Sequence, residues 1–162
     1  MHYAAWYPTL FVPRGRGKFS SFGKLGKHLK FAERASRQLA RAIFHAMAIY
    51  QAKLERKQRT LFRIVDIGTD LFAMSASITY AQHLAKQGGA TANAHDLADQ
   101  FCREARLRIE RNFATLFDNF DDQSYKVAMS FMKGEYQWAE GLLVEGIVPT
   151  PETVEAAIRS MA

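Results

Sequence analysis

The apolar residues of the chain recur at steps of three and four positions from about residue 26 onward, which is the spacing of one helix face. In the first such stretch the apolar positions are Leu29, Ala32, Leu39, Ile43, Ala46, Met47 and Tyr50. No proline interrupts residues 26–87, so helices can run without a kink there. The polar run at residues 55–60 is where we predict a break between two helices.

Further helices are predicted at residues 60–86, 95–117 and 121–133, and a final one after Thr150 and Pro151. Gly88 and Gly89 close the first of these, because glycine readily adopts the backbone conformation that ends a helix. Asn93 or Thr91 caps the second. Proline at the first position of the final helix is a favoured arrangement.

The absence of any long alternating apolar and polar run argues against strands. The sequence therefore predicts an all-α fold, an antiparallel helical bundle of about four to five helices with an irregular N-terminal arm. We divide the chain into an aromatic and basic arm at residues 1–24, a helical bundle domain at 25–148, and a C-terminal helix at 149–162.

The arm at residues 1–24 interleaves aromatic and basic residues with prolines and glycines, which argues against a continuous helix. So many aromatic side chains are unfavourable in water, and we expect the arm to dock on this chain or on a partner. An anionic membrane surface is the alternative, because Trp, Tyr and basic side chains favour membrane interfaces. The candidate contact residues are Trp6, Tyr7, Phe11, Arg14, Arg16 and Lys18.

The composition is that of a globular domain, with 162 residues, 48% hydrophobic residues and a net charge of +6. The charge is uneven, because residues 1–63 carry 14 basic and two acidic residues whereas the remainder carries 8 basic and 14 acidic residues. Two halves of opposite sign can attract each other, or the basic half can bind an anionic partner. No nucleic-acid motif is present and the acidic half opposes such binding, so we expect no nucleic-acid partner.

The chain has features typical of a protein of a reducing compartment. No apolar stretch reaches the roughly 20 residues of a membrane span, and no secretory signal is recognisable. Cys102 is the single cysteine, so no internal disulfide can form. These features predict a cytoplasmic location, with peripheral membrane attachment through the arm as the alternative.

Two acids stand four positions apart in the mostly apolar stretch at residues 63–82, and Asp66 and Asp70 therefore share one helix face. Carboxylate metal sites in bundles need Glu-x-x-His spacings, and the chain has none, so we predict no metal site. We interpret Arg63, Asp66 and Asp70 as a structural ion-pair group. Arginines of the first or third helix are expected to compensate the acids, because unpaired buried carboxylates are costly. Gly68 between them is expected to permit close approach of a neighbouring helix.

Other candidate chemistries fail on their spacing. His95 with Asp99 supplies two metal ligands, too few for a zinc site. Residues 17–25 resemble a phosphate-binding loop only loosely, since five residues separate the glycines and Leu25 replaces the Ser or Thr that holds Mg²⁺. Cys102 lies within a predicted amphipathic helix and is interpreted as a buried, inert thiol. No catalytic residue is assigned.

An ordered set of residues then points to a family. It consists of Gln58, Leu61, Arg63, Asp66, Asp70, Leu71, Phe72, Ala73 and Met74. Their order and spacing within residues 52–88 resemble the C-terminal helical domain of very-long-chain members of the acyl-CoA dehydrogenase family. The similarity continues through residues 91–109 and fades after about residue 146, so it covers about two-thirds of the chain.

The resemblance implies an accessory helical domain, or a fragment, of a FAD-dependent acyl-CoA dehydrogenase of fatty-acid β-oxidation, with a structural or docking role. Members of the family oxidise acyl-CoA with FAD and a glutamate base, both held by a catalytic core that precedes this domain. Glu140-Gly141 and Glu145-Gly146 lack the neighbours of that glutamate loop, so no catalytic or cofactor-binding residue is carried over. The resemblance makes the chain part of an oxidoreductase, and it does not decide whether the chain alone is an enzyme.

By the same resemblance, FAD belongs to the parent enzyme and the chain itself is expected to hold no cofactor. The expected partner is the catalytic core, in the same or a separate chain, and an oligomer is also compatible. The alternative function is a peripheral membrane-associated or scaffold helical protein that uses its basic aromatic arm.

Overall fold

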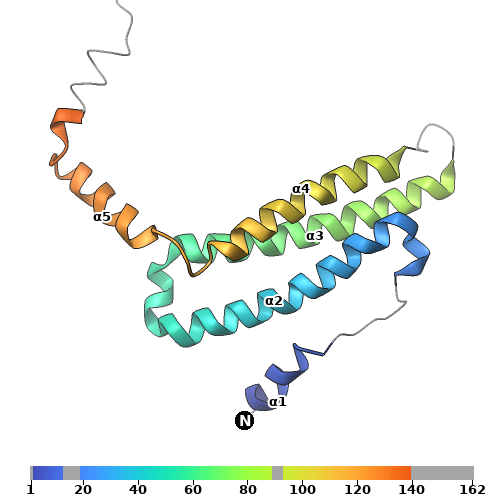
Figure 1. Ribbon diagram of the computed structural model, residues 1–162, viewed down its shortest axis with the longest axis horizontal. Coiled ribbons are helices and arrows are strands. Elements are labelled where there is room, and N and C mark those ends of the chain that lie inside the picture. Colours follow the sequence, from blue (N-terminus) through green and yellow to red (C-terminus); the bar gives the residue numbers. More distant parts are fainter. Residues whose placement is uncertain (1, 13–18, 89–92, 140–162) are drawn as a thin grey trace, which may run out of the picture. The chain divides into compact units, whose positions relative to one another are not determined.

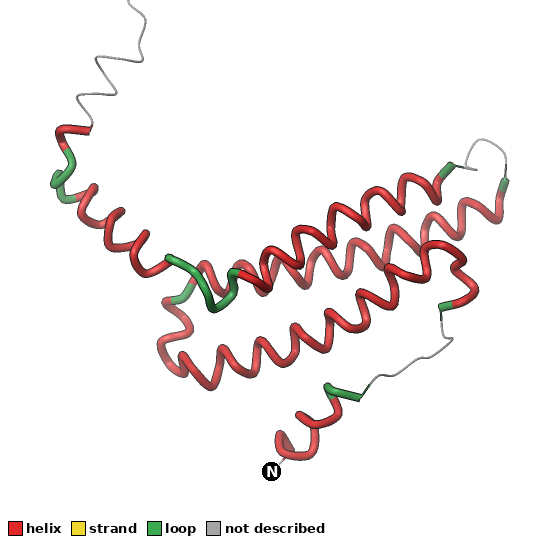
Figure 2. Tube along the Cα trace, viewed as in Figure 1, coloured by secondary structure: helices red, strands yellow, loops and turns green. Residues whose placement is uncertain are grey.

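The computed structural model describes residues 2–12, 19–88 and 93–139. It divides into two compact units, Met1–Asn119 and Phe120–Ala162. The division falls inside the range 25–148 that the sequence suggested as one bundle domain. The described residues form helices and turns and contain no strand (Figures 1 and 2), which confirms the predicted all-α class. The C-terminal helix predicted at 149–162 lies outside the described residues.

Three long helices form the first unit. Its elements are α1 (His2–Thr9), the short 3-10 helix η1 (Ser20–Leu25), α2 (Gly26–Tyr50), the 3-10 helix η2 (Gln51–Arg56), α3 (Gln58–Gln87) and α4 (Ala94–Ala114). Figure 1 shows α2, α3 and α4 side by side, each running opposite to the next. The predicted break at residues 55–60 corresponds to η2 and the turn at Lys57, so the apolar periodicity located all three long helices.

The core forms where α3 meets its two neighbours. Its buried residues on α3 are Ile67, Leu71, Met74, Ile78 and Ala81, those on α4 are Ala98, Cys102, Ala105 and Ile109, and those on α2 include Phe31, Ala32 and Ala35. The alternating steps of four and three residues place each set on one helix face. Alanine at many of these positions lets the backbones approach closely, since the distance between packed helices depends on the side chains at the contact.

Glycine is required at two helix ends, by a close contact at one and by a positive φ at the other, and it is not required at a third position inside a helix. A Cβ atom on Gly26 would lie 2.5 Å from the carbonyl oxygen of Phe19, so only glycine fits at the start of α2. Gly88 has a φ of 72° and ends α3, as predicted. A Cβ atom on Gly68 would meet only the Leu39 Cδ2 atom, at 3.9 Å, which is an ordinary contact. The close helix approach expected at Gly68 is therefore not observed.

The N-terminal arm is less irregular than predicted, because it contains α1 and η1. Tyr7 and the Nε2 atom of His45 on α2 are hydrogen-bonded at 2.7 Å, and the Tyr7 ring centroid lies 5.1 Å from that of Phe44. Arg41 donates from Nη1 to the Leu10 carbonyl oxygen at 2.9 Å. Aromatic packing on α2 thus accounts for a helix at a segment whose proline and glycine content argues against one.

The second unit contains the α-helix α5 (Asp121–Met132), close to the predicted range 121–133. None of its residues is buried. Its large apolar side chains are exposed, among them Tyr125, Val127 and Met132. An isolated helix of this length is marginally stable in water, so α5 depends on contacts for its stability.

Candidate functional site

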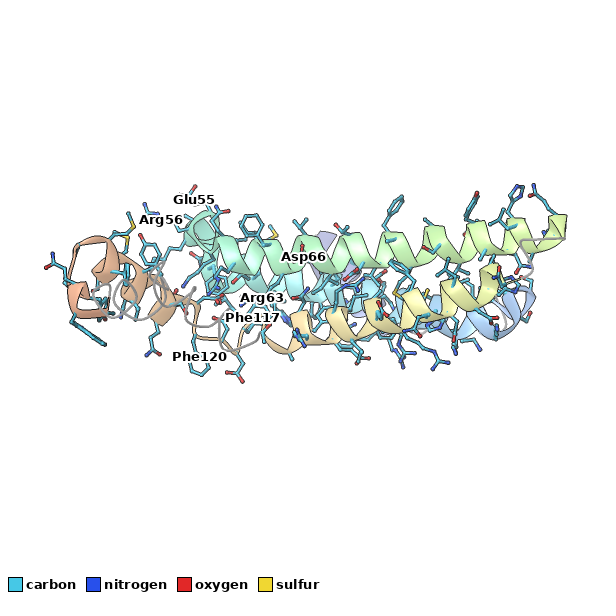
Figure 3. The ribbon with its side chains drawn as sticks, turned by 90° about the horizontal axis from the view of Figure 1, so that it is seen from above. Glu55, Arg56, Arg63, Asp66, Phe117 and Phe120 are labelled. Atoms are coloured by element: carbon cyan, nitrogen blue, oxygen red, sulfur yellow. The ribbon has the colours of Figure 1, made fainter. Side chains whose placement is uncertain are left out.

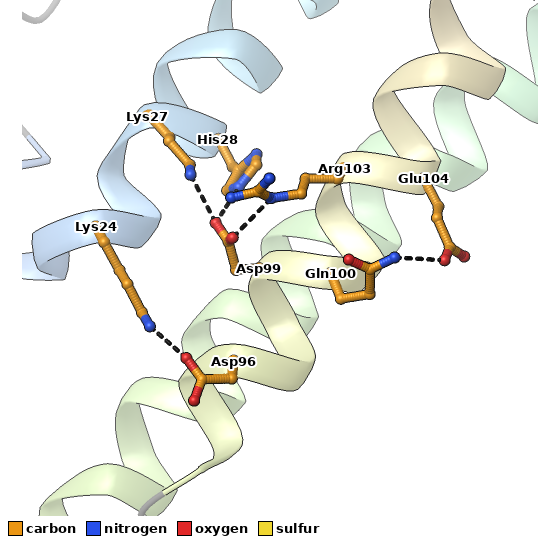
Figure 4. Close-up of polar contacts among 8 residues, drawn as sticks. All are labelled: Lys24, Lys27, His28, Asp96, Asp99, Gln100, Arg103 and Glu104. Carbon is orange, nitrogen blue, oxygen red and sulfur yellow. Dashed lines mark hydrogen bonds and ion pairs between the residues drawn. The ribbon is translucent and has the colours of Figure 1, made fainter.

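The densest polar contacts in the first unit surround Asp99 on α4 (Figure 4). Its Oδ1 atom lies 2.8 Å from the Lys27 Nζ atom and 2.8 Å from the His28 Nε2 atom, both at the start of α2. Arg103, one turn further along α4, donates from Nε to Oδ2 at 2.8 Å. These four residues form what we call the Asp99 cluster, which ties the first turn of α2 to α4.

Burial and hydrogen bonding set the charges in the Asp99 cluster. Hydrogen bonds from Lys27 and His28 hold the pKa of Asp99 well below its usual range. Burial lowers the pKa of His28, although Asp99 partly opposes this effect. Neutral His28 donates from Nε2, and its buried Nδ1 atom has no hydrogen-bond partner among the described residues.

This arrangement is unsuited to proton transfer. The Asp99 carboxylate already accepts from three donors, so its affinity for a further proton is low. The His28 side chain is fully buried, so substrate in solvent cannot reach its ring. The Asp99 cluster therefore has the geometry of a structural link between two helices.

The two acids that were predicted to act together on α3 have different surroundings in the structure. Arg108 on α4 donates to Asp70 from Nη2 to Oδ1 at 2.7 Å and from Nε to Oδ2 at 3.1 Å. The Asp70 side chain is 15% exposed, and its hydrogen bonds raise the pKa of Arg108. Asp66 is exposed and lies on α3 three residues after Arg63, both labelled in Figure 3. Arg63 is half-buried on the same helix.

A second arginine of α4 contacts α2 in a different way. The Arg106 guanidinium carbon lies 4.6 Å from the centroid of the Phe31 ring, within the range of a cation–π interaction. Helix α4 therefore contacts both neighbours through arginine, with Arg106 against α2 and Arg108 against Asp70 of α3. An arginine of the third predicted helix does meet one of the two acids, while the other acid remains in solvent.

Cys102 lies in the core between the helices and is completely buried. Burial raises the pKa of its thiol to about 11, so it stays protonated and unreactive near neutral pH. Across residues 2–12, 19–88 and 93–139, no three His, Cys, Asp or Glu side chains gather as a metal site would require. None of the helices described there is long and apolar enough to cross a membrane.

The arm residues proposed for docking are only partly within the described chain. Tyr7 contacts α2 as given above, and the Phe11 ring lies 4.7 Å from the Arg41 guanidinium carbon. Trp6 is 41% exposed. The basic residues of the prediction, Arg14, Arg16 and Lys18, lie outside the described residues.

An open groove of about 380 Å³ lies between the C-terminal part of α3 and the N-terminal part of α4. Its lining includes Tyr80, Ala81, Leu84, Leu97, Ala98 and Phe101, and it contains no charged side chain. A second groove, of about 330 Å³, lies between α2 and α4 and includes Arg34 and Glu110. Neither groove contains a residue of the Asp99 cluster.

Sequence reasoning missed the Asp99 cluster because His28 and Asp99 are 71 residues apart. It considered Asp99 as a possible metal ligand together with His95, on the same helix. One signal was available: His28 occupies an apolar stripe that continues through Ala32 and Ala35. A histidine in such a stripe needs a buried partner, and an acid on a neighbouring helix can supply it.

Comparison with known proteins gives two concordant matches. The family model described as "ACAD9/ACADV, C-terminal domain" matches residues 23–134. The chain is 42% identical over 141 residues, 85% of its length, to the "Probable acyl-CoA dehydrogenase FadE10" of Mycobacterium tuberculosis and to that of Mycobacterium bovis. The match covers 22% of the relatives, so the chain spans about a fifth of the curated relatives it matches. No solved structure matches the chain.

Proposed function

The chain belongs to the ACAD9/ACADV C-terminal domain family, and from this premise we propose that it is the accessory helical domain of a FAD-dependent acyl-CoA dehydrogenase. In this function it packs against the catalytic part of the enzyme and stabilises it, and the catalytic part carries out the oxidation. The parent enzyme acts on acyl-CoA thioesters of fatty-acid β-oxidation in the cytoplasm. The catalytic part is in the same polypeptide or in a partner chain.

The observation that carries this proposal is the 42% identity over 141 residues to a protein named as an acyl-CoA dehydrogenase, of which those residues are only 22%. The part of such a protein that lies outside the matched residues is large enough to hold the flavin and the catalytic base. The matched share contains the whole three-helix core of the first unit. A packed helical core of this kind is suited to a supporting role.

The polar residues of the core agree with a supporting role. The Asp99 cluster and the Asp70–Arg108 pair each join one helix to another. The acid of each group is paired with a cation of the same domain, and Cys102 is buried in the core. The arm's Tyr7 is engaged with α2, which leaves fewer free aromatic side chains for a lipid surface. We therefore do not carry the membrane alternative further.

The described grooves do not fit FAD. A flavin dinucleotide needs donors or cations for its pyrophosphate, as at the N-termini of helices in dinucleotide-binding folds. The groove between α3 and α4 has an apolar lining without a charged side chain, and the one near Arg34 also carries Glu110. Our proposal assigns no step of the reaction to residues of this chain.

A chimera tests the proposal. The matched segment of the M. tuberculosis relative is replaced by this chain, with two controls: a deletion of the segment, and its replacement by an unrelated helical bundle of similar length. We expect the chimera to purify with bound flavin that acyl-CoA reduces, and both controls to lose flavin or solubility. A chimera that behaves like the controls contradicts the proposal, as does stoichiometric flavin in the isolated chain.

A further inference from the structure

The outward side of α3 carries a regular row of uncharged residues. The row consists of Phe62, Val65, Thr69, Phe72, Ala76, Thr79 and His83, at alternating steps of three and four residues, and we call it the outer seam. All seven residues are exposed. Phe72 is 75% exposed, Phe62 61% and Val65 60%, which is unusual for apolar side chains at consecutive positions of one helix face.

The outer seam lies opposite the buried face of α3. The core already takes Ile67, Leu71, Met74 and Ile78 from that helix. A helix at a protein surface normally turns charged residues outward, and a helix that is apolar on both sides is normally covered on both. Helix α4 follows the usual rule, because exposed Arg103, Glu104, Glu110 and Arg111 line its outward side. The outward row of α3 differs from this side of α4 because it contains no Lys, Arg, Asp or Glu, although exposed Asp66 lies beside it.

Two hydroxyl groups on this side of α3 donate hydrogen bonds within the helix. Ser75 donates from Oγ to the Leu71 carbonyl oxygen at 2.9 Å, and Thr79 donates from Oγ1 to the Ser75 carbonyl oxygen at 2.8 Å. These bonds turn the polar atoms back toward the helix backbone. The Ser75 and Thr79 hydroxyls therefore keep a hydrogen-bond partner when this surface is covered by an apolar contact.

The shape of the seam fits a helix. An open hollow of about 520 Å³ is lined by Phe72, Ser75, Ala76, Thr79, Tyr80 and His83, with the small residues between two aromatic side chains. Alternating steps of three and four residues give an average period of 3.5, the spacing at which two helices pack with knobs into holes. Ala76 provides the space for a large side chain of the opposite helix.

We propose that the outer seam of α3 is the surface that packs against a helix of the catalytic part of the parent acyl-CoA dehydrogenase. This inference rests on the proposed function. The curated relatives extend over more than four times the length that this chain matches, and that additional polypeptide is the available occupant. The seam contains no Lys or Arg, so it lacks the charges that attract anionic lipid or nucleic acid.

Single-cysteine labelling tests the seam. Cys102 is buried and unreactive, so an introduced thiol can be followed on its own. Ala76→Cys places the thiol in the seam, and Leu107→Cys is the matched control at a 67% exposed apolar position of α4. Maleimide labelling of each site is measured by peptide mass spectrometry, in the isolated chain and in the chimera described above.

We expect Ala76→Cys to react at least about tenfold more slowly in the chimera than in the isolated chain, because labelling then requires the interface to open. Leu107→Cys should react at similar rates in both. A chimera that holds flavin and turns over but labels at Ala76→Cys as fast as the isolated chain overturns the inference and leaves the proposed function intact. A chimera without flavin or activity contradicts the proposed function instead.

Two further outcomes also count against the inference. If Ala76→Cys is already protected in the isolated chain and the protection rises with protein concentration, a second copy of the chain covers the seam. If protection in the isolated chain is independent of concentration, another part of the same chain covers it. Ala76→Glu provides an independent measurement: it should release the domain in the flavin-loaded chimera and make it sensitive to limited proteolysis, whereas Leu107→Glu should not.

Discussion

Removal of the Asp99 carboxylate should destabilise the first unit more than removal of any other acid in it. Asp99→Ala leaves both ring nitrogens of fully buried His28 without partners, and an unpartnered buried polar group costs about 1–3 kcal/mol. The ion pairs of Asp99 with Lys27 and Arg103 involve cations that are 48% and 62% exposed, so each contributes only about 0.2–1 kcal/mol. The free energy of unfolding should therefore fall by about 2–4 kcal/mol.

Asp96 on the same helix is the matched control (Figure 4). It also pairs with a lysine, Lys24, but its side chain is 73% exposed. Asp96→Ala should therefore cost less than about 1 kcal/mol. Urea unfolding of wild type and both variants, followed by circular dichroism, provides the comparison. Equal losses for Asp99→Ala and Asp96→Ala would refute the view that buried His28 depends on the carboxylate.

The pH dependence gives a second signature of the Asp99 cluster. The pKa of His28 is lowered from 6.5 in the folded state, so its contribution to stability is present above pH 6.5 and declines below it. Lys27 and Arg106 also lower that pKa, whereas Asp99 raises it, so Asp99→Ala should steepen the decline. The pKa of Asp99 is lowered from 3.8, so its own contribution is lost below pH 3.8. The difference in the free energy of unfolding between wild type and variant should thus widen as the pH falls below 6.5 and narrow below 3.8.

Three further predictions concern other positions. Gly68→Ala should raise the free energy of unfolding by about 0.5–1 kcal/mol, because the new methyl group meets only an ordinary contact. Gly26→Ala should lower it by about 1–3 kcal/mol, because its methyl group would collide with the Phe19 carbonyl oxygen. Urea unfolding of both variants checks the sign of each change. Asp70→Ala should lower the free energy of unfolding by about 1–3 kcal/mol, because it removes the two-point contact with Arg108. Asp66→Ala should lower it by less than about 0.5 kcal/mol, because Asp66 is exposed. Similar losses for the two variants in urea unfolding would contradict the different surroundings of the two acids. Cys102 should resist maleimide at pH 7 until denaturant is added, and fast labelling of the folded chain would show that the thiol is accessible.

The sequence predicted the long helices well because their apolar residues repeat over many turns. Helix α3 was expected at residues 60–86 and spans Gln58–Gln87, with Gly88 at its end. Helix α1 was not predicted, since it is short, contains Pro8 and is held by Tyr7 against α2. Local propensity cannot reveal a helix whose stability comes from a distant partner.

The polar contacts were predicted less completely, because each joins residues far apart in the chain. The spacing of Asp66 and Asp70 placed them on one helix face, but it could not show which of them faces a neighbour. The structure places only Asp70 against an arginine, Arg108, which is 38 residues away. The family resemblance, by contrast, rested on local order and spacing, and the matches over residues 23–134 confirm it.

The uneven charge of the chain has a specific use within the first unit. Basic residues early in the chain pair with acids of α4, as in Lys24–Asp96 and Lys27–Asp99. Helices α2 and α4 flank α3 and meet through long or polar side chains, including His28 with Asp99 and Arg106 with Phe31. These ion pairs join η1 and α2 to α4, and none of them involves a residue of the outer seam of α3.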